Sequence, residues 1–283
     1  MKILITGTNG QVGHALMREL IDHELIGLTR KDCELTNLDQ FKQIIDHHQP
    51  NLIINPAAYT KVDQAEDEPE LAFLINRDAP KVMAEKAREY NIPLIHFSTD
   101  YVFDGEKKGA YKEDDPTNPL GVYGASKLAG EEVIQHVGGK FYIFRTSWVY
   151  SNIGQNFFLT MKKLCQEREE LKVVSDQMGV PTSNQFIAEQ MKTIIPHLTE
   201  SNTGIYHLVP DGSSSWYEFA QEIIRQTNPQ FDLESLYPIQ SHEFLTKTKR
   251  PKNSILNNAK IKQSFNLTLK NWQAELEKVI DEA

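Results

Sequence analysis

Short apolar runs alternate with longer amphipathic stretches along the first half of the chain. Five runs are nearly continuous in Ile, Leu, Val and Phe, which predicts buried strands, and the stretches between them have the apolar spacing of helices. The expected strands are 2–6, 24–29, 51–55, 93–98 and 141–146, and the expected helices are 11–22, 39–48, 65–90 and 121–137. This alternation predicts an α/β fold, a Rossmann-like doubly wound parallel sheet with helices on both faces.

The pattern loosens after residue 150. One strand-like run remains at 171–175, and helical spacing returns at 184–198, 215–226 and 270–281, with turn residues and prolines between them. We therefore expect one domain over residues 1–150 and a smaller, partly helical C-terminal lobe over residues 151–283, some of whose segments return to the main sheet.

Composition narrows the class of protein. The chain has 283 residues, of which 40% are hydrophobic and 24% charged, so it can bury a sizeable core. Its two cysteines, Cys33 and Cys165, are too few for a disulfide framework, which favours free thiols in the cytoplasm. The first residues have neither the apolar segment nor the small-residue cleavage site of a signal peptide, so we expect a protein that is not secreted. No apolar run approaches the roughly 20 residues that cross a bilayer. The net charge of -9 argues against a nucleic-acid partner.

Three glycines follow the first expected strand and open the first expected helix. Gly7, Gly10 and Gly13 have the spacing GxxGxxG, a variant of the dinucleotide fingerprint. Glycines permit a tight turn and a close approach of the backbone to a pyrophosphate, whose charge the helix N-terminus attracts. The position of this turn favours a bound nucleotide over a purely structural role, so residues 1–150 are expected to be a dinucleotide-binding domain.

Two basic side chains lie at the end of the second expected strand. A cofactor with a free ribose 2′-hydroxyl usually meets a carboxylate there, but this chain has Thr29, Arg30 and Lys31. The pattern predicts a 2′-phosphate, and hence NADPH. NADH stays open because Glu34 is close in sequence, and Arg30 has the alternative of being a solvated surface residue.

A phenol and an ammonium are spaced to share one face of the helix expected over residues 121–137. Tyr123 and Lys127 are four residues apart. A phenol has a pKa of about 10, which a neighbouring cation in a desolvated cleft lowers. Tyr123 would then give a proton to a carbonyl oxygen as hydride reaches its carbon. Thr99, at the end of the fourth strand, would bond the same oxygen or merely cap a loop.

Together these residues resemble the extended short-chain dehydrogenase/reductases, and the dTDP-4-dehydrorhamnose reductase family most closely. The resemblance covers nearly the whole chain, and so many segments in the right order are more specific than any one motif. The matching segments are 7–13, 55–63, 65–66, 75–76, 98–103, 122–131, 144–150, 176–182, 204–207, 250–251 and 253–254.

The resemblance implies NAD(P)H-dependent reduction of the C4 ketone of dTDP-4-dehydro-6-deoxy-L-mannose to dTDP-L-rhamnose. It implies that Tyr123 donates the proton, Lys127 orients the nicotinamide ribose and lowers the phenol pKa, and Thr99 assists at the ketone. With the glycine turn and Arg30 added, the expected cofactor contacts are Gly7, Gly10, Gln11, Val12, Gly13, Arg30, Ala58, Tyr59, Thr60, Tyr123 and Lys127. The expected substrate contacts are Thr99, Asp100, Trp148 and Arg250, although Trp148 could be core and Arg250 part of a turn. The resemblance also implies that residues 151–283 are predominantly the sugar-nucleotide-binding lobe.

One position departs from some members of the family. They place a glutamate two residues after the third glycine and bridge a dimer through a divalent ion, whereas this chain has Ala15. No paired-cysteine or HExxH spacing occurs either. We expect no metal site, a dTDP-sugar substrate, and a monomer or a homodimer that no metal bridges.

Two alternatives have different chemistry. A sugar-nucleotide dehydratase of this group has Thr-Asp-Glu after the fourth strand, but here Tyr101 follows Asp100, and an epimerase of the same fold is a further possibility. The second alternative is a non-catalytic protein similar to the regulatory subunit of methionine adenosyltransferase. The presence of Thr99, Tyr123 and Lys127 favours a reductase.

Overall fold

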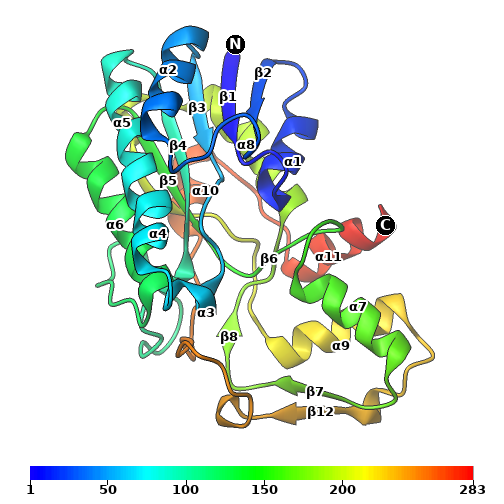
Figure 1. Ribbon diagram of the computed structural model, residues 1–283. Coiled ribbons are helices and arrows are strands. Elements are labelled where there is room, and N and C mark those ends of the chain that lie inside the picture. The colour runs from blue at the N-terminus through cyan, green and yellow to red at the C-terminus, as the bar shows by residue number, and fades with distance from the viewer. Residues whose placement is uncertain (283) are drawn as a thin grey trace.

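A six-stranded parallel sheet forms the centre of the computed structural model, which describes residues 1–282 (Figure 1). The strands follow the order β10-β5-β4-β3-β1-β2 across the sheet. The order reverses between β1 and β3, and open α/β sheets bind ligands beside the carboxyl ends of strands at such a point. The Rossmann-like α/β fold is confirmed. The strand bounds are β1 Lys2–Thr6, β2 Glu24–Leu28, β3 Leu52–Asn55, β4 Leu94–Thr99, β5 Phe141–Thr146 and β10 Gly204–His207.

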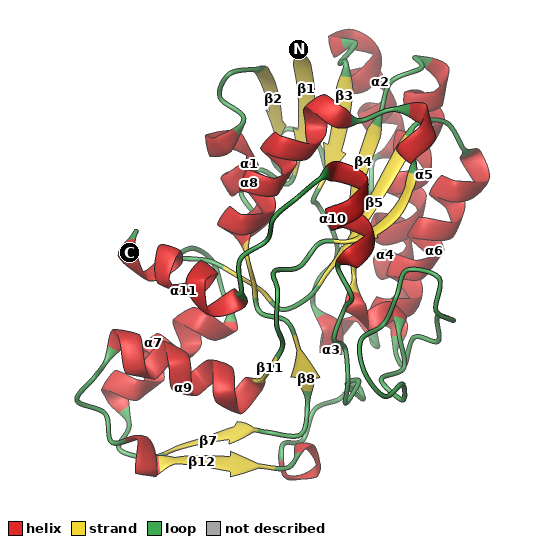
Figure 2. Cartoon of the chain, turned by 180° about the vertical axis from the view of Figure 1, so that it is seen from behind, coloured by secondary structure: helices red, strands yellow, loops and turns green. Residues whose placement is uncertain are grey.

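Helices cover both faces of the sheet, as Figures 1 and 2 show. β1 illustrates the cause, because successive side chains of a strand point to opposite faces. Ile3 and Ile5 pack in the core under α1, α8 and α10, whereas Leu4 packs in the core under α2, α5 and α6. The bounds are α1 Gln11–Glu19, α8 Asn184–Ile194 and α10 Ala259–Phe265 on one face, and α2 Leu38–His48, α5 Ala79–Glu89 and α6 Val122–Val137 on the other.

The second half of the chain builds a lobe with its own core. Phe158, Phe219 and Leu276, from three different helices, are fully buried in that core. These helices lie above a two-stranded ribbon, and short strand pairs lead back to the main sheet (Figure 2). The bounds are α7 Phe157–Glu167, α9 Trp216–Thr227, α11 Trp272–Asp281, β7 Leu171–Val174 with β12 Leu236–Ile239, β8 Met178–Gly179 with β11 Ser214–Ser215, and β6 Val149–Tyr150 with β9 Thr182–Ser183.

The long helix expected over residues 65–90 is wrong, because the structure divides it. Proline disfavours a helical conformation in the residue before it, and Pro69 begins a new helix. A π-helical turn follows before α5 begins. The pieces are α3 Val62–Ala65, α4 Pro69–Phe73 and the π-helix Leu74–Asp78.

Proline also shortens the helix expected over residues 184–198. α8 ends at Ile194, and Pro196 lies in a 3-10 turn because it cannot continue the α-helical hydrogen bonds. Within residues 1–282, no helix combines the length and the apolar character that crossing a membrane requires. The 3-10 turns are Asp100–Val102, Ile195–His197, Glu200–Asn202, Leu233–Ser235 and Ser241–Glu243.

Candidate active site

The glycine turn joins β1 to α1 in a conformation that other residues would strain. Gly7 has φ +58°, and a Cβ atom on Gly13 would lie 2.3 Å from the Gly7 carbonyl oxygen. Gly10 is the N-cap of α1, and its backbone N–H donates to the same carbonyl over 2.9 Å. The N–H groups of the first helical turn have no intrahelical partner, so Gln11, Val12 and Gly13 offer donors to an anion.

The Gln11 side chain makes hydrogen bonds to residues in the second half of the chain. Its Oε1 accepts hydrogen bonds from Ser151 Oγ over 2.7 Å and from Asn156 Nδ2 over 2.9 Å. Its backbone oxygen accepts from Asn184 Nδ2 over 3.0 Å. The side chain therefore ties the glycine turn to the second half of the chain.

The end of β2 presents cations beside a carboxylate that is already engaged. Asp32 accepts hydrogen bonds from Thr29 N over 2.8 Å and from Thr29 Oγ1 over 2.6 Å. These bonds hold the pKa of Asp32 below its usual value. Arg30 and Lys31 are exposed in the same turn. The arrangement suits a phosphate better than a hydroxyl, because the nearest carboxylate bonds its own turn.

Ala58, Tyr59 and Thr60 follow β3 in a loop that the π-helix holds. Asn76 Oδ1 accepts from Tyr59 N over 2.8 Å, and Asn76 Nδ2 donates to Tyr59 O over 3.1 Å and to Ser126 Oγ over 2.9 Å. The buried amide thus fixes the loop against α6. Single-turn π-helices are frequent at functional sites, but neither this turn nor the role of Asn76 was predicted.

The phenol of Tyr123 lies against the hydroxyl of Thr99. Tyr123 is in the first turn of α6, and Thr99 ends β4. The Thr99 side chain is near enough to the phenol to lower its pKa, and the ring of Tyr101 packs edge-on against Tyr123 with centroids 5.5 Å apart. The Thr99 hydroxyl also donates to Asp100 Oδ1 over 3.0 Å. The structure thus brings a phenol, a hydroxyl and a carboxyl group together at the end of the sheet.

The structure does not show the expected effect of Lys127 on this phenol, because Lys127 is not among the groups that lower the pKa of Tyr123. Burial raises the pKa of Tyr123 to about 12, although the nearby Thr99 side chain opposes the rise. Lys127 is turned into the sheet, where its Nζ donates to Phe97 O over 2.7 Å and lies 3.2 Å from His96 Nε2. A phenol with that pKa is protonated at neutral pH, which is the form that a proton donor needs.

Lys127 is almost completely buried, with 2% of its surface exposed. Burial lowers its pKa to about 8, and the Glu131 carboxylate one turn further along α6 opposes this change. Glu131 is itself paired with Arg145 of β5, whose Nη2 lies 2.6 Å from Glu131 Oε2. Both protonation states of Lys127 are therefore accessible near neutral pH.

The expected substrate residues Asp100 and Arg250 both lie near Tyr101. Burial raises the pKa of Asp100 to about 6, and its Oδ2 is buried without a partner among the described residues. The charge of Arg250 acts on the Tyr101 phenol, although burial dominates and raises the pKa of Tyr101. Arg250 Nη2 lies 3.5 Å from Asp63 Oδ2. This ion pair joins the two halves of the chain across the candidate site.

Trp148 belongs to a separate aromatic cluster. Its φ of +46° is unusual for a bulky residue. The indole stacks on Trp216 with centroids 3.6 Å apart, and a Cβ atom on Gly179 would lie 2.4 Å from it. These contacts are in the second half of the chain, and the indole is half-buried rather than part of a closed core.

Metal ligands do not gather in the part of the chain that the structure describes. No group of three His, Cys, Asp or Glu side chains there has an arrangement that could hold an ion. Ala15 lines a small hollow that also includes His14 and Glu19.

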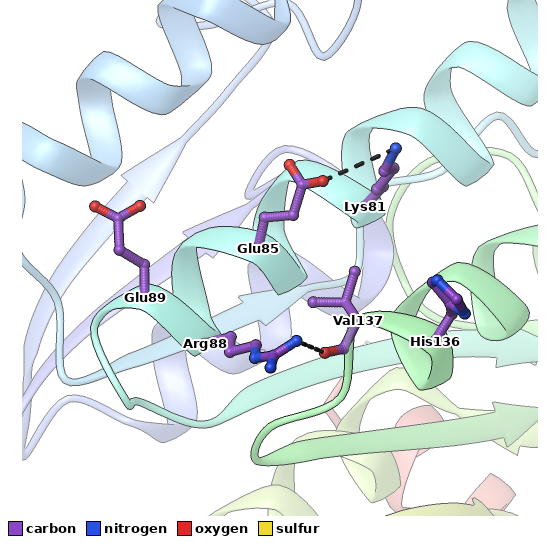
Figure 3. Close-up of a pocket in the computed structure, with 6 residues that line it drawn as sticks. All are labelled: Lys81, Glu85, Arg88, Glu89, His136 and Val137. Atoms are coloured by element: carbon purple, nitrogen blue, oxygen red, sulfur yellow. Dashed lines mark hydrogen bonds and ion pairs between the residues drawn. The ribbon is translucent and has the colours of Figure 1, made fainter.

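A larger hollow lies outside the candidate site, between α5 and the C-terminal end of α6 (Figure 3). Its charged groups have partners: Lys81 Nζ lies 3.9 Å from Glu85 Oε1, and Arg88 Nη1 donates to Val137 O over 2.7 Å. His136 lines it from the last turn of α6, which is roughly 20 Å along the helix from Tyr123.

A family model, two sequence relatives and a solved structure that match this chain agree on one family. The model of the family described as "RmlD substrate binding domain" matches residues 1–283. The dTDP-4-dehydrorhamnose reductase of Aggregatibacter actinomycetemcomitans is 40% identical, with 98% of each chain covered. That of Escherichia coli K12 is 39% identical, covering 100% of this chain and 98% of the other. A Bacillus anthracis dTDP-4-dehydrorhamnose reductase, crystallised in complex with NADP, superposes with a TM-score of 0.94 at 36% identity, covering 100% of this chain and 99% of that one.

None of these three relatives is named as a dehydratase, an epimerase or a regulatory subunit. The likeness extends over both halves of the chain rather than over residues 1–150 alone. The chain belongs to the dTDP-4-dehydrorhamnose reductase family.

Proposed function

We propose that this protein reduces the C4 ketone of dTDP-4-dehydrorhamnose to dTDP-L-rhamnose with NADPH. The observation that carries this proposal is the meeting of the Thr99 hydroxyl and the Tyr123 phenol at the end of β4, with Lys127 buried behind them. Family membership and the reductase names of the relatives support the substrate. The NADP complex of the Bacillus anthracis relative supports the cofactor.

The chain offers contacts along the length of a dinucleotide. The first-turn N–H groups of Gln11, Val12 and Gly13 would hold the pyrophosphate. At one end, Arg30 would pair with the 2′-phosphate, because a guanidinium binds phosphate oxygens through two parallel hydrogen bonds. At the other end, Ala58, Tyr59 and Thr60 would border the cofactor, and Lys127 would orient the nicotinamide ribose. NADPH, when bound, supplies the hydride.

Tyr123 would act as the acid. When hydride reaches C4, the ketone oxygen gains negative charge and becomes far more basic than a phenolate, so the protonated phenol can transfer its proton. The Thr99 hydroxyl would donate a hydrogen bond to the same oxygen, which favours the charge that develops in the transition state. No acidic phenol is required in the resting protein. Lys127, as an ammonium, would stabilise the phenolate that remains.

The remaining expected residues would hold the sugar nucleotide. Arg250 would exchange its ion pair with Asp63 for the diphosphate, and Asp100 would bond a sugar hydroxyl through the oxygen that now lacks a partner. Trp148 would present the half-buried face of its indole to the substrate. We also infer action in the cytoplasm, because Cys33 and Cys165 are free thiols, and a monomer or homodimer that needs no bridging metal.

The purified chain, NADPH and dTDP-4-dehydrorhamnose test the proposal, with loss of reduced nicotinamide followed by absorbance and the product identified by NMR. We expect one equivalent of NADPH to be oxidised for each dTDP-L-rhamnose formed. Product without net oxidation would indicate an epimerase or dehydratase instead. Nucleotide binding without any turnover would favour a regulatory protein.

A further inference from the structure

Four buried polar side chains form a row from Lys127 to the glycine turn. Lys127 Nζ lies 3.2 Å from His96 Nε2, and His96 Nδ1 lies 3.0 Å from Asn55 Nδ2. Asn55 Oδ1 accepts from Thr6 Oγ1 over 2.6 Å. All four are at most 2% exposed, and they come from β1, β3, β4 and α6. Thr6 directly precedes Gly7, so the row crosses the sheet beneath the candidate cofactor site.

With the Asn55 amide oriented as it is in the structure, the hydrogen bonds place the proton of His96 on Nε2. Because Asn55 Oδ1 accepts from Thr6, its Nδ2 must donate to His96 Nδ1, which is then a lone pair. The ring is neutral, since burial and the Lys127 charge hold the pKa of His96 well below its usual value. Its proton therefore sits on Nε2 and faces Lys127 Nζ. An ammonium cannot accept a hydrogen bond, so this arrangement suits Lys127 as the uncharged amine.

The same positions of the four side chains also suit the Lys127 ammonium if the donor and the acceptor of each hydrogen bond in the row are exchanged. Rotation of the Asn55 amide by half a turn lets His96 Nδ1–H donate to the amide oxygen. His96 Nε2 then becomes a lone pair that accepts from the Lys127 ammonium. The Thr6 hydroxyl has lone pairs that accept from the rotated amide. Both directions satisfy each contact of His96, and the charge of Lys127 decides between them.

The other groups around Lys127 cannot switch between accepting and donating a hydrogen bond when the charge of Lys127 changes. The Phe97 carbonyl only accepts, and Glu131 is paired with Arg145 of β5. The π-helix packed against α6 presents Asn76, an uncharged amide that bonds Ser126 and the Tyr59 backbone. His96 is therefore the one titratable side chain besides Glu131 that acts on Lys127 in the described residues.

We propose that His96 is a positioning residue for Lys127, which accepts a hydrogen bond from the ammonium and donates one to the amine, so that the lysine stays in place as its charge changes. The proposal depends on the role given above to Lys127. In this proposal, the Asn55 amide and the Thr6 hydroxyl exchange donor and acceptor roles when the imidazole proton changes from one ring nitrogen to the other. No proton passes along the row, since the ring remains neutral in both states.

The direct test is the tautomer of His96 in the wild-type protein, read from the ¹⁵N shifts of its ring between about pH 6.5 and about pH 9.5. This range brackets the Lys127 pKa of about 8. We expect the proton on Nδ1 at the acid end and on Nε2 at the alkaline end, without any charging of the ring. Lys127→Met assigns the signals and should abolish the change. A single tautomer across the range would overturn the proposal.

Kinetics of paired variants give an independent readout. His96→Leu should move the alkaline limb of the kcat/KM profile to lower pH, by up to about one unit, because an ammonium loses more than an amine when its buried acceptor is removed. His96→Gln keeps a donor and an acceptor and should restore the wild-type limb. His207→Leu is the matched control, since His207 is also 0% exposed in the sheet but bonds Asn257 O instead.

The outcomes separate this proposal from the proposed function. Loss of activity with Lys127→Met, together with a wild-type pH profile in His96→Leu, would refute the role of His96 and keep that of Lys127. An equal loss at every pH that follows the melting temperature would mean that His96 only supports the fold. Full activity of Lys127→Met would contradict the role of Lys127 itself.

Discussion

The two sides of the candidate site are built in different ways. Thr99 and Lys127, on the side made by β4 and α6, are 5% and 2% exposed. Lys127 donates to Phe97 O of β4, and the Thr99 side chain bonds Asp100 in the 3-10 turn that follows β4. On the opposite side, the Arg250 side chain is 29% exposed, and its partner Asp63 is 44% exposed. Exposed ion pairs contribute roughly 0–1 kcal/mol, whereas a buried polar group without a partner costs about 1–3 kcal/mol. The side assigned to the chemistry is therefore fixed, and the side assigned to the sugar nucleotide can rearrange.

Tyr123→Phe has the largest expected effect, and it tests the buried side. The substitution removes the proposed proton donor and leaves the ring that packs against Tyr101. General acid catalysis contributes about 10²- to 10⁴-fold, so kcat should fall by that factor. NADPH affinity, measured by fluorescence titration, should be nearly unchanged. Turnover close to the wild-type rate would remove Tyr123 from the mechanism.

Asp100→Asn should stabilise the fold at neutral pH. Burial raises the pKa of Asp100 from 3.8 to about 6, so the folded state binds the proton more tightly than the unfolded state. Stability is therefore lost as pH rises through the interval from about 4 to about 6, by about 3 kcal/mol at 1.36 kcal/mol per unit. The variant should be more stable than wild type by up to that amount at pH 7 in urea unfolding. The free energies of unfolding of the variant and the wild type should coincide near pH 4. A variant that is less stable than the wild type at pH 7 would contradict the raised pKa of Asp100.

Arg250 and Asp63 test the exposed side, and their substitutions should act in opposite directions. Arg250→Ala removes the proposed diphosphate contact, so KM for the sugar nucleotide should rise about tenfold or more. Asp63→Asn releases the guanidinium from its competing partner and should lower KM by no more than about fivefold, the value of an exposed ion pair. Steady-state kinetics measures both, with kcat as the internal control. A rise of KM in both variants would show that the ion pair positions Arg250 rather than competing for it.

Arg30→Ser should have a smaller effect that is confined to the cofactor. Loss of one guanidinium contact with the 2′-phosphate should raise KM for NADPH roughly tenfold and leave KM for NADH unchanged. The ratio of the two kcat/KM values measures this. If wild type already prefers NADH, the interpretation of the β2 end is wrong.

The first five strands of the sheet were predictable to within one residue at each end because each is a continuous apolar run. α7 and β10 were missed for different reasons. Asn156 caps α7 and was an available signal, since its side chain accepts from Leu159 N. β10 has four residues, and its pairing with β5 brings together segments about sixty residues apart in the chain, which no local pattern shows.

The candidate site shows the same limit. Thr99, Tyr123 and Lys127 could be chosen from the sequence because a strand end and a helical repeat place them together. His96, Asn76 and Asp63 could not, because their partners come from other elements: His96 meets Asn55, which is 41 residues away in the chain, and Asn76 meets Ser126 at a separation of 50. The direction in which Lys127 points also depends on those contacts, so its hydrogen bonds to Phe97 O and His96 could not be predicted from the spacing of Tyr123 and Lys127.

The most direct test of the reaction is a tracer experiment with NADPH that carries deuterium at the transferable position of the nicotinamide. Incubation with the purified protein and dTDP-4-dehydrorhamnose should place one deuterium on C4 of the rhamnose, and NMR of the product reads this position. Deuterium at C4 in one stereochemical form would support hydride delivery to a ketone held against Tyr123 and Thr99. A product without deuterium at C4, or a sugar that keeps its ketone while NADPH stays reduced, would contradict the account.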